Sequence, residues 1–174
     1  MKKLVLLTLV LSSMVLFSCK KKEDNSGKQT GTLSTVPAFS IPSMWGDTCT
    51  PKDYAGKPAI VEIWSMRCPH CRTQAKYLEE LATKLDFAKY AIVSIHAGGG
   101  EKMKDQISAH FKNKKIQVCL DDGSYMKALK TLPKPLQVRG IPHLFLVNSK
   151  GEIEEVLRGA RPADFLMKKL KSLK

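Results

Sequence analysis

The chain of 174 residues carries 29 Lys and Arg against 16 Asp and Glu, which gives a formal net charge of +13 at pH 7. This length suits one globular domain with a sizeable core once the N-terminus is set aside. The lysines are dispersed with little aromatic interleaving, as expected of solvated helix faces and of attraction to an anionic membrane. The composition therefore argues against nucleic-acid binding.

The N-terminus, residues 1–18, has the features of a signal peptide. A basic start, Met1-Lys2-Lys3, precedes an apolar run over 4–17 that is short for a membrane span. The run ends at Leu16-Phe17-Ser18-Cys19, which resembles a bacterial lipobox with Cys19 as the lipidated residue, although Phe17 departs from the small residue often found there. The alternatives are a plain signal or a membrane anchor to which Cys19 is incidental. Each predicts an exported domain in the bacterial cell envelope, on its periplasmic side or at the cell surface.

Residues 19–36 are rich in Lys, Ser, Thr and Gly, and we predict a lipidated N-terminus followed by a flexible tether. The folded domain is expected to cover 37–174. Its first elements are two short strands, at 38–41 and around 47–50, on either side of a turn. The pair predicts a hairpin.

Alternating strands and helices follow, which predicts an α/β domain with a central sheet and helices on both faces. We expect core strands at 59–64, 90–96 and 116–120, and an antiparallel hairpin formed by 143–147 and 152–158, so the sheet is mixed. Apolar residues at three- and four-residue steps predict four helices. The third of these helices covers 125–132. The inward-facing residues of the other three are Ala75, Leu78, Leu81, Ala82 and Leu85; Met103, Ile107 and Phe111; and Phe165, Leu166, Leu170 and Leu173.

The sequence Cys68-Pro69-His70-Cys71 lies between the first core strand and its helix, where a CxxC pair is typical of a redox dithiol. With Cys68 as N-cap, Pro69 occupies the first helical position, where a missing N–H costs nothing. The helix dipole, an imidazolium at His70 and the cation of Arg67 then favour the thiolate of Cys68, our predicted nucleophile. Cys71, one turn further on, is the predicted resolving thiol.

The same spacing also suits a zinc half-site, but no second Cys or His pair supplies the other two ligands, so we predict no metal. A c-type haem site would need His at the position of Arg72. Cys49 and Cys119 belong neither to the CxxC motif nor to the lipobox-like segment. In an exported domain they would form either a structural disulfide or two buried free thiols.

Three separated elements resemble the thioredoxin fold in the same order: Glu62 with Trp64, the CxxC motif, and Val138-Arg139-Gly140-Ile141-Pro142 before a strand. The N-terminal hairpin and the additional α-β element between His96 and Arg139 are similar to the TlpA/ResA-like periplasmic thiol-disulfide oxidoreductases. The Pro-His dipeptide is instead similar to that of DsbA. The resemblance covers about residues 38–174 and implies a thiol-disulfide oxidoreductase.

The resemblance also implies roles for individual residues. Pro142 matches the family's cis-proline beside the dithiol, and the backbone of Ile141 would pair with the substrate chain. Glu62 matches a buried acid behind the dithiol, with a raised pKa that lets it exchange a proton with Cys71 through water; the alternative is an exposed Glu on an edge strand. Arg67 stands where many relatives have Trp.

We therefore predict catalytic roles for Cys68, Cys71, Glu62, His70 and Pro142, and substrate contacts from Ile141, Trp64, Arg67 and Pro69. The expected partners are protein thiols and disulfides and a membrane redox partner, with no cofactor beyond the dithiol. The membrane-tethered architecture indicates a reductant, whereas the dipeptide indicates an oxidant.

Two other classes of function remain open at this point. One is a copper carrier on the same fold that uses Cys68, Cys71 and a histidine, for which His143 is the obvious candidate. The other is an inert redox fold retained for protein interaction.

Overall fold

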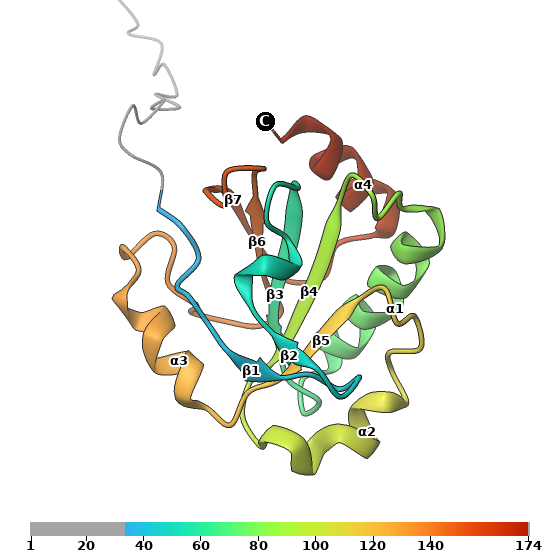
Figure 1. The fold of residues 1–174 in the computed structure, drawn as a ribbon, viewed down its shortest axis with the longest axis vertical. Helices are drawn as coiled ribbons and strands as arrows, with labels where there is room; N and C mark the ends of the chain where they lie inside the picture. Colours follow the sequence, from blue (N-terminus) through green and yellow to red (C-terminus); the bar gives the residue numbers. More distant parts are fainter. Residues whose placement is uncertain (1–33, 174) are drawn as a thin grey trace, which may run out of the picture. The chain divides into compact units, whose positions relative to one another are not determined.

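In the computed structural model, which describes residues 34–173, the domain is built on a five-stranded sheet of order β5-β4-β3-β6-β7 (Figure 1). The strands are β3 (Ala59–Trp64), β4 (Ala91–His96), β5 (Gln117–Leu120), β6 (His143–Val147) and β7 (Ile153–Arg158). β3 is parallel to β4 and antiparallel to β6, while β4 and β5 are parallel and β6 and β7 antiparallel. The mixed sheet predicted from the sequence is confirmed.

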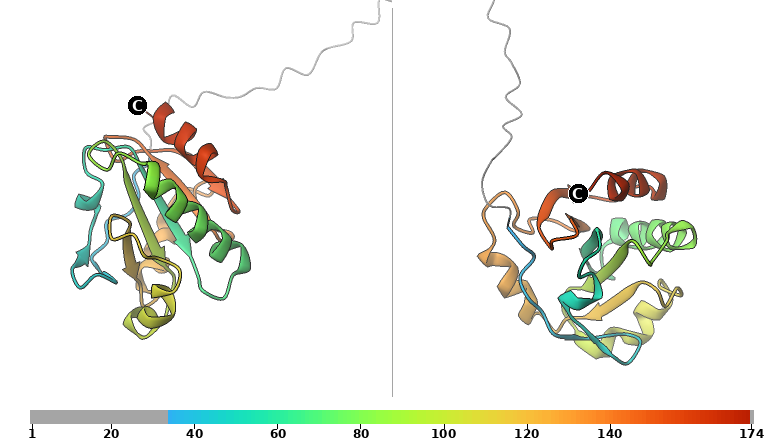
Figure 2. Two further views of the ribbon diagram at one scale, coloured as in Figure 1. Left: turned by 90° about the vertical axis from the view of Figure 1, so that its right-hand side faces the viewer. Right: turned by 45° about the horizontal axis from the view of Figure 1, so that its top comes forward.

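Helices cover both faces of this sheet (Figure 2). The helices are α1 (Pro69–Lys84), α2 (Lys104–Ser108), α3 (Ser124–Ala128) and α4 (Ala163–Ser172), with short 3-10 segments η1 (Pro51–Asp53), η2 (Gly100–Met103) and η3 (Leu129–Thr131). α1 and α4 lie side by side on one face, where Leu78 and Leu166 are fully buried. On the other face α3 packs with the N-terminal segment through Tyr125 and Phe39. The thioredoxin-like arrangement of the core is therefore as expected.

The predicted helices differ from the observed ones in three places. The predicted helix 125–132 is divided into α3 and the 3-10 segment η3. α2 is only five residues long, and Phe111 lies beyond it, yet Phe111 is fully buried because the chain turns it back onto Trp64. In α4, Leu166 and Leu170 face the core as predicted, but Phe165 is 39% exposed. Phe165 precedes Leu166 by one position, which places it about 100° around the helix and off the buried stripe.

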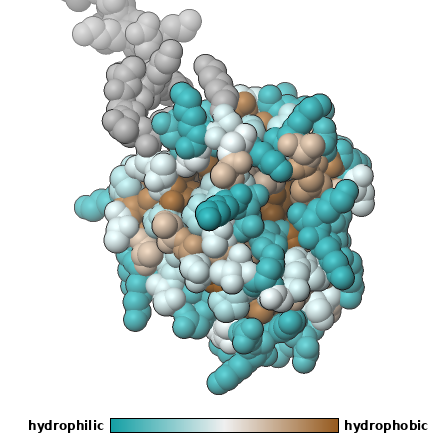
Figure 3. Space-filling view, in the orientation of Figure 1, coloured by the Kyte–Doolittle hydropathy of each residue, from teal (hydrophilic) through white to brown (hydrophobic). Residues whose placement is uncertain are grey.

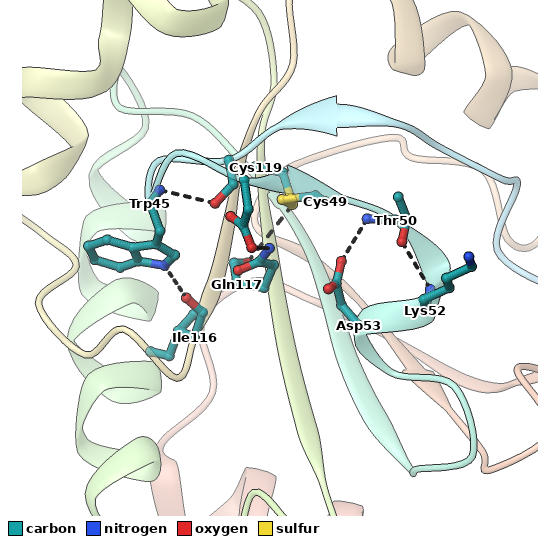
Figure 4. The surroundings of a disulfide bond; sticks show 10 residues. Trp45, Cys49, Thr50, Lys52, Asp53, Ile116, Gln117 and Cys119 are labelled. Atoms are coloured by element: carbon teal, nitrogen blue, oxygen red, sulfur yellow. Dashed lines mark hydrogen bonds between the residues drawn. A yellow bond between two sulfur atoms is a disulfide. The ribbon is translucent and has the colours of Figure 1, made fainter.

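The predicted N-terminal hairpin is formed by β1 (Ile41–Pro42) and β2 (Thr48–Cys49), which pair antiparallel. A disulfide joins Cys49 of β2 to Cys119 of β5, with the two Cα atoms 5.8 Å apart (Figure 4). Both cysteines are fully buried. Of the two states left open by the sequence, the structure has the disulfide.

The hairpin turn covers the outer edge of β5. Met44 donates its backbone N–H to Val118 O (2.8 Å), and the indole of Trp45 donates to Ile116 O (2.8 Å) (Figure 4). The side-chain amide of Gln117 donates to Asp47 (3.2 Å). An uncovered edge strand would offer these backbone groups to another chain, so the hairpin and its disulfide close an edge that otherwise invites aggregation.

The packed domain begins a few residues before the predicted boundary at 37. Ile153 donates its N–H to Ser34 O (2.8 Å), Thr35 forms a bridge with Glu152, and Val36 is buried. The predicted signal peptide, Cys19 and the tether up to residue 33 lie outside the described residues. Within 34–173, no helix has the length and apolar character needed to cross a membrane.

Hydrophilic side chains project around most of the surface shown in Figure 3, with apolar residues in the recesses between them. Phe165 is the one large apolar side chain that is exposed among the described residues. The dispersed lysines thus lie on solvated faces, as their distribution in the sequence predicts.

The disulfide closes a loop of 70 residues, so its removal should lower the free energy of unfolding by about 4 kcal/mol. The measurement is urea denaturation of the Cys68→Ser/Cys71→Ser protein, in which Cys49–Cys119 is the one remaining disulfide of the domain, against the same protein with Cys49→Ala/Cys119→Ala. Dithiothreitol should lower the midpoint of the first protein and leave the second unchanged. An unchanged midpoint in both would show that the bond adds no stability.

Candidate active site

The CxxC motif lies where β3 ends and α1 begins. Cys68 is the N-cap of α1 with extended backbone (φ −95°, ψ 114°), and Pro69 is the first helical residue. The sulfur of Cys68 accepts the N–H of Cys71 at 3.2 Å. A thiolate at this position receives both a hydrogen bond and the positive end of the helix dipole, so the local geometry stabilises the charged nucleophile.

The two thiols differ in accessibility. Both are free in the structure, with Cys68 partly exposed and Cys71 fully buried. Burial raises the pKa of the Cys71 thiol, and its contact with Cys68 and the charge of Glu62 add to this. The outer thiol is therefore placed to attack a substrate, and the inner thiol is held protonated until a base removes its proton.

The loop before β6 faces Cys68. The thiol of Cys68 donates to the carbonyl oxygen of Ile141 at 3.5 Å, and the Ile141–Pro142 peptide bond is cis, as predicted. Pro142 is buried, and its carbonyl accepts the N–H of Gly159 (2.9 Å) from the loop after β7. Three loops from one edge of the sheet thus meet at the dithiol.

Glu62 is fully buried in the middle of β3, which excludes the alternative of an exposed residue on an edge strand. One carboxyl oxygen accepts the hydroxyl of Ser94 at 2.6 Å, and the other has no hydrogen-bond partner among the described residues. Burial raises the pKa of Glu62 to about 8, although the Ser94 hydrogen bond opposes the shift. A carboxyl group with this pKa can both accept and release a proton near neutral pH.

The remaining predicted site residues divide between surface and interior. Arg67, Pro69 and His70 are exposed around Cys68. Trp64 is fully buried and packs edge-on against His96 and Phe111. The prediction that Trp64 contacts substrate is therefore wrong for its side chain, because the indole belongs to the core beneath the site.

Two residues that the sequence did not suggest hold the loop leading to Cys68. His96, at the end of β4, accepts the N–H of Met66 through Nε2 (3.0 Å), and Arg72 of α1 donates to Met66 O (2.9 Å). Burial lowers the pKa of His96, so the neutral ring that this hydrogen bond requires is favoured. The contact depends on the pairing of Trp64 with His96 across β3 and β4, which no sequence motif reveals.

A third such residue is Gln74, which is fully buried in α1. Its side-chain oxygen accepts the N–H of Arg161 (2.7 Å), in the loop between β7 and α4. The first turns of α1 are thereby tied to the loop that also bonds Pro142 through Gly159.

His143, the candidate third ligand for copper, is buried in β6 with its ring against Phe145. Burial lowers its pKa to about 4, with a contribution from the charge of Arg158. Among residues 34–173, no three Cys, His, Asp or Glu side chains are grouped so that they could hold a metal ion. The copper-carrier alternative thus has no ligand set in this part of the chain.

The sequence of the chain is similar to that of a known protein family and of individual relatives. The sequence model of the AhpC/TSA family matches residues 33–156. The thiol:disulfide interchange protein DsbE of Pseudomonas fluorescens biotype C is 31% identical over 121 residues, and the match covers 68% of this chain and 62% of the relative. The thiol-disulfide oxidoreductase ResA of Oceanobacillus iheyensis is 24% identical over 166 residues, covering 93% of this chain and 82% of the relative.

Solved structures show the same fold. A thiol:disulfide interchange protein of the thioredoxin family from Chlorobium tepidum superposes with a TM-score of 0.69 at 19% identity, covering 82% of this chain and 97% of that one. An exposed lipoprotein thioredoxin from Streptococcus pneumoniae gives 0.65 at 21% identity, covering 79% and 100%. The chain therefore belongs to the AhpC/TSA family and is a thiol-disulfide oxidoreductase with a thioredoxin-like fold.

Proposed function

We propose that this protein exchanges disulfides with exported protein substrates through Cys68 and Cys71, with no cofactor beyond the dithiol. The observation that carries the proposal is the pairing of a partly exposed Cys68 with a buried Cys71 at a helix N-terminus. The carbonyl of Ile141 beside Cys68 supports a place for the substrate backbone.

In the reductive direction, the Cys68 thiolate attacks one sulfur of a substrate disulfide. A Cys68–substrate disulfide forms, and the other substrate sulfur leaves as a thiolate that takes up a proton. Cys71, deprotonated by Glu62, then attacks Cys68, which forms the Cys68–Cys71 disulfide and releases the second substrate thiolate. The substrate gains the two electrons that the dithiol loses, and a partner dithiol must return them. The oxidative direction reverses each step.

Glu62 serves as the proton exchanger for Cys71 in this scheme. Its raised pKa of about 8 and its influence on the Cys71 thiol support the role. Because both groups are buried, the proton passes through a water molecule rather than through bulk solvent.

We place the protein in the cell envelope, anchored by lipid at Cys19, with residues 20–33 as a tether. The leader composition and the lipobox-like ending support this placement, as does the disulfide between Cys49 and Cys119, since structural disulfides persist in oxidising compartments. The S. pneumoniae neighbour, which has the same fold and is described as an exposed lipoprotein, supports the proposal of such an anchor. A membrane redox partner would then restore the dithiol.

The direction of electron flow follows from the reduction potential of the Cys68–Cys71 pair, measured in glutathione buffers by thiol trapping. A potential near or above about −150 mV assigns the protein as a disulfide donor, and one below about −230 mV assigns it as a reductant.

Turnover should depend on the two cysteines in different ways. Cys68→Ser should abolish the reduction of a protein disulfide, whereas Cys71→Ser should accumulate a mixed disulfide with the substrate that is visible on a non-reducing gel. Turnover should be unaffected by a metal chelator. Activity that survives Cys68→Ser, or that chelation removes, would contradict the proposed function.

Glu62 should make the protein less stable as pH rises. The folded protein binds the Glu62 proton up to a pKa of about 8, whereas the unfolded chain releases it near 4.5, so stability falls between these two values. Relative to Glu62→Gln, the wild type should lose about 3 to 5 kcal/mol of unfolding free energy over this range. Urea denaturation of both proteins from pH 4 to pH 9 measures the difference, and parallel curves would show that Glu62 does not titrate in this window.

A further inference from the structure

Positive and negative side chains lie at different parts of the sheet edge that carries the dithiol. Five loops meet this edge: those that follow β3, β4, β5 and β7, and the one that precedes β6. Arg67 lies in the loop after β3, Arg139 before β6 and Arg161 after β7, and these three loops contain no Asp or Glu. The loop after β5 carries Asp121 and Asp122 instead. In the strand order β5-β4-β3-β6-β7, the edge is thus acidic at one end and cationic from β3 onward.

The dithiol lies within the cationic half of this edge. Cys68 directly follows Arg67 and contacts the carbonyl of Ile141, two residues after Arg139. The loop of Arg161 is tied to α1 by Gln74 and to Pro142 by Gly159. These bonds hold the loop of Arg161 beside α1 and beside the loop that carries Arg139 and Ile141.

The guanidinium groups of Arg67 and Arg139 are available to a partner. Both residues are exposed, and neither side chain forms a hydrogen bond or ion pair within the described part of the chain. The ion pairs there belong to lysines on other elements, namely Lys84, Lys89 and Lys169. An unpaired arginine suits carboxylate recognition because its planar guanidinium binds both oxygens at once.

A cavity of about 430 Å³ lies at the β5 end of this edge and is lined by Glu101, Asp121 and Asp122, by Lys102 and by glycines after β4. Arg67 lines a neighbouring cavity together with His96 and Gly99. The acids therefore lie on the β4 side of Arg67, whereas Arg139, which precedes β6, lies further from them in the strand order.

We infer that the preferred substrates are proteins whose reacting cysteine is flanked by Asp or Glu, and that Arg67 and Arg139, in the two loops that meet at Cys68, bind those carboxylates. This inference rests on the proposed oxidoreductase function and names the substrate class of the same site. Charge complementarity of this kind acts chiefly on the rate of encounter and on the choice of partner.

The test uses three peptides, each with one intramolecular disulfide and identical except that the residues beside the cysteines are Glu, Gln or Lys. The purified, fully reduced protein is mixed with each peptide, and the second-order rate of peptide reduction is followed by acid quench and chromatography. We expect the Glu peptide to react about tenfold faster than the Lys peptide at low salt, with the ratio approaching one in 1 M salt.

Arg67→Gln and Arg139→Gln should each lower the Glu-to-Lys rate ratio about threefold. Lys171→Gln, which removes an exposed positive charge at the far end of α4, is the matched control and should leave the ratio unchanged. A ratio near one in the wild type, or an equal fall in all three variants, would overturn the inference.

The peptide experiment also distinguishes a failure of the proposed function from a failure of the inferred substrate preference. If the reduced protein does not reduce the Gln peptide and the oxidised protein does not oxidise its dithiol form, the proposed function fails along with the inference. If either reaction proceeds while the Glu and Lys peptides react equally, the inference alone fails. Sedimentation with vesicles of 3:1 neutral to anionic phospholipid tests whether the arginines bind a lipid surface instead of a substrate protein. Vesicle binding that Arg139→Gln removes, with the peptide ratio unchanged, would assign the cationic half to the membrane and overturn the inference.

Discussion

The arrangement of the active site depends on the pairing of β3 with a neighbour on each side. All six residues of β3 are buried, and the strand is parallel to β4 and antiparallel to β6. The parallel pairing with β4 brings His96 level with Trp64, and the antiparallel pairing with β6 brings His143 level with Ile63. The CxxC helix and the cis-proline loop must therefore emerge at one edge, although about 70 residues separate them in sequence.

Because Cys71 is buried, a base inside the protein must remove its proton. Cys71 lies in the apolar layer between β3 and α1, where its thiolate is poorly solvated. Glu62 is the ionisable group that β3 supplies at the same depth, and its hydrogen bond to Ser94 leaves one oxygen unpaired. The low-dielectric surroundings thus raise the pKa of both the Glu62 carboxyl and the Cys71 thiol. Glu62 can therefore accept the proton of Cys71 while neither group carries a permanent buried charge.

The sequence predicted those features that depend on local pattern. The boundaries of β3 and the N-cap role of Cys68 follow from apolar runs and from the CxxC spacing, whereas the burial of Glu62 was implied by the family resemblance. The sequence could not supply contacts that depend on strand register or loop geometry, such as His96 with Met66. The substrate contact expected of Trp64 came from the family resemblance, and the burial of its indole against His96 and Phe111 depends on contacts that the sequence does not reveal.

The order of the cysteines along the chain has a consequence for biosynthesis. Of the four cysteines in the described domain, Cys49 is synthesised first and its native partner Cys119 last, after Cys68 and Cys71. The thiols of Cys68 and Cys71 are therefore present before Cys119, and thiol-disulfide exchange is the reaction that can move a bond of Cys49 from one of them to Cys119. Cys49 thus has three possible partners within the domain, and the native one is the last to be made.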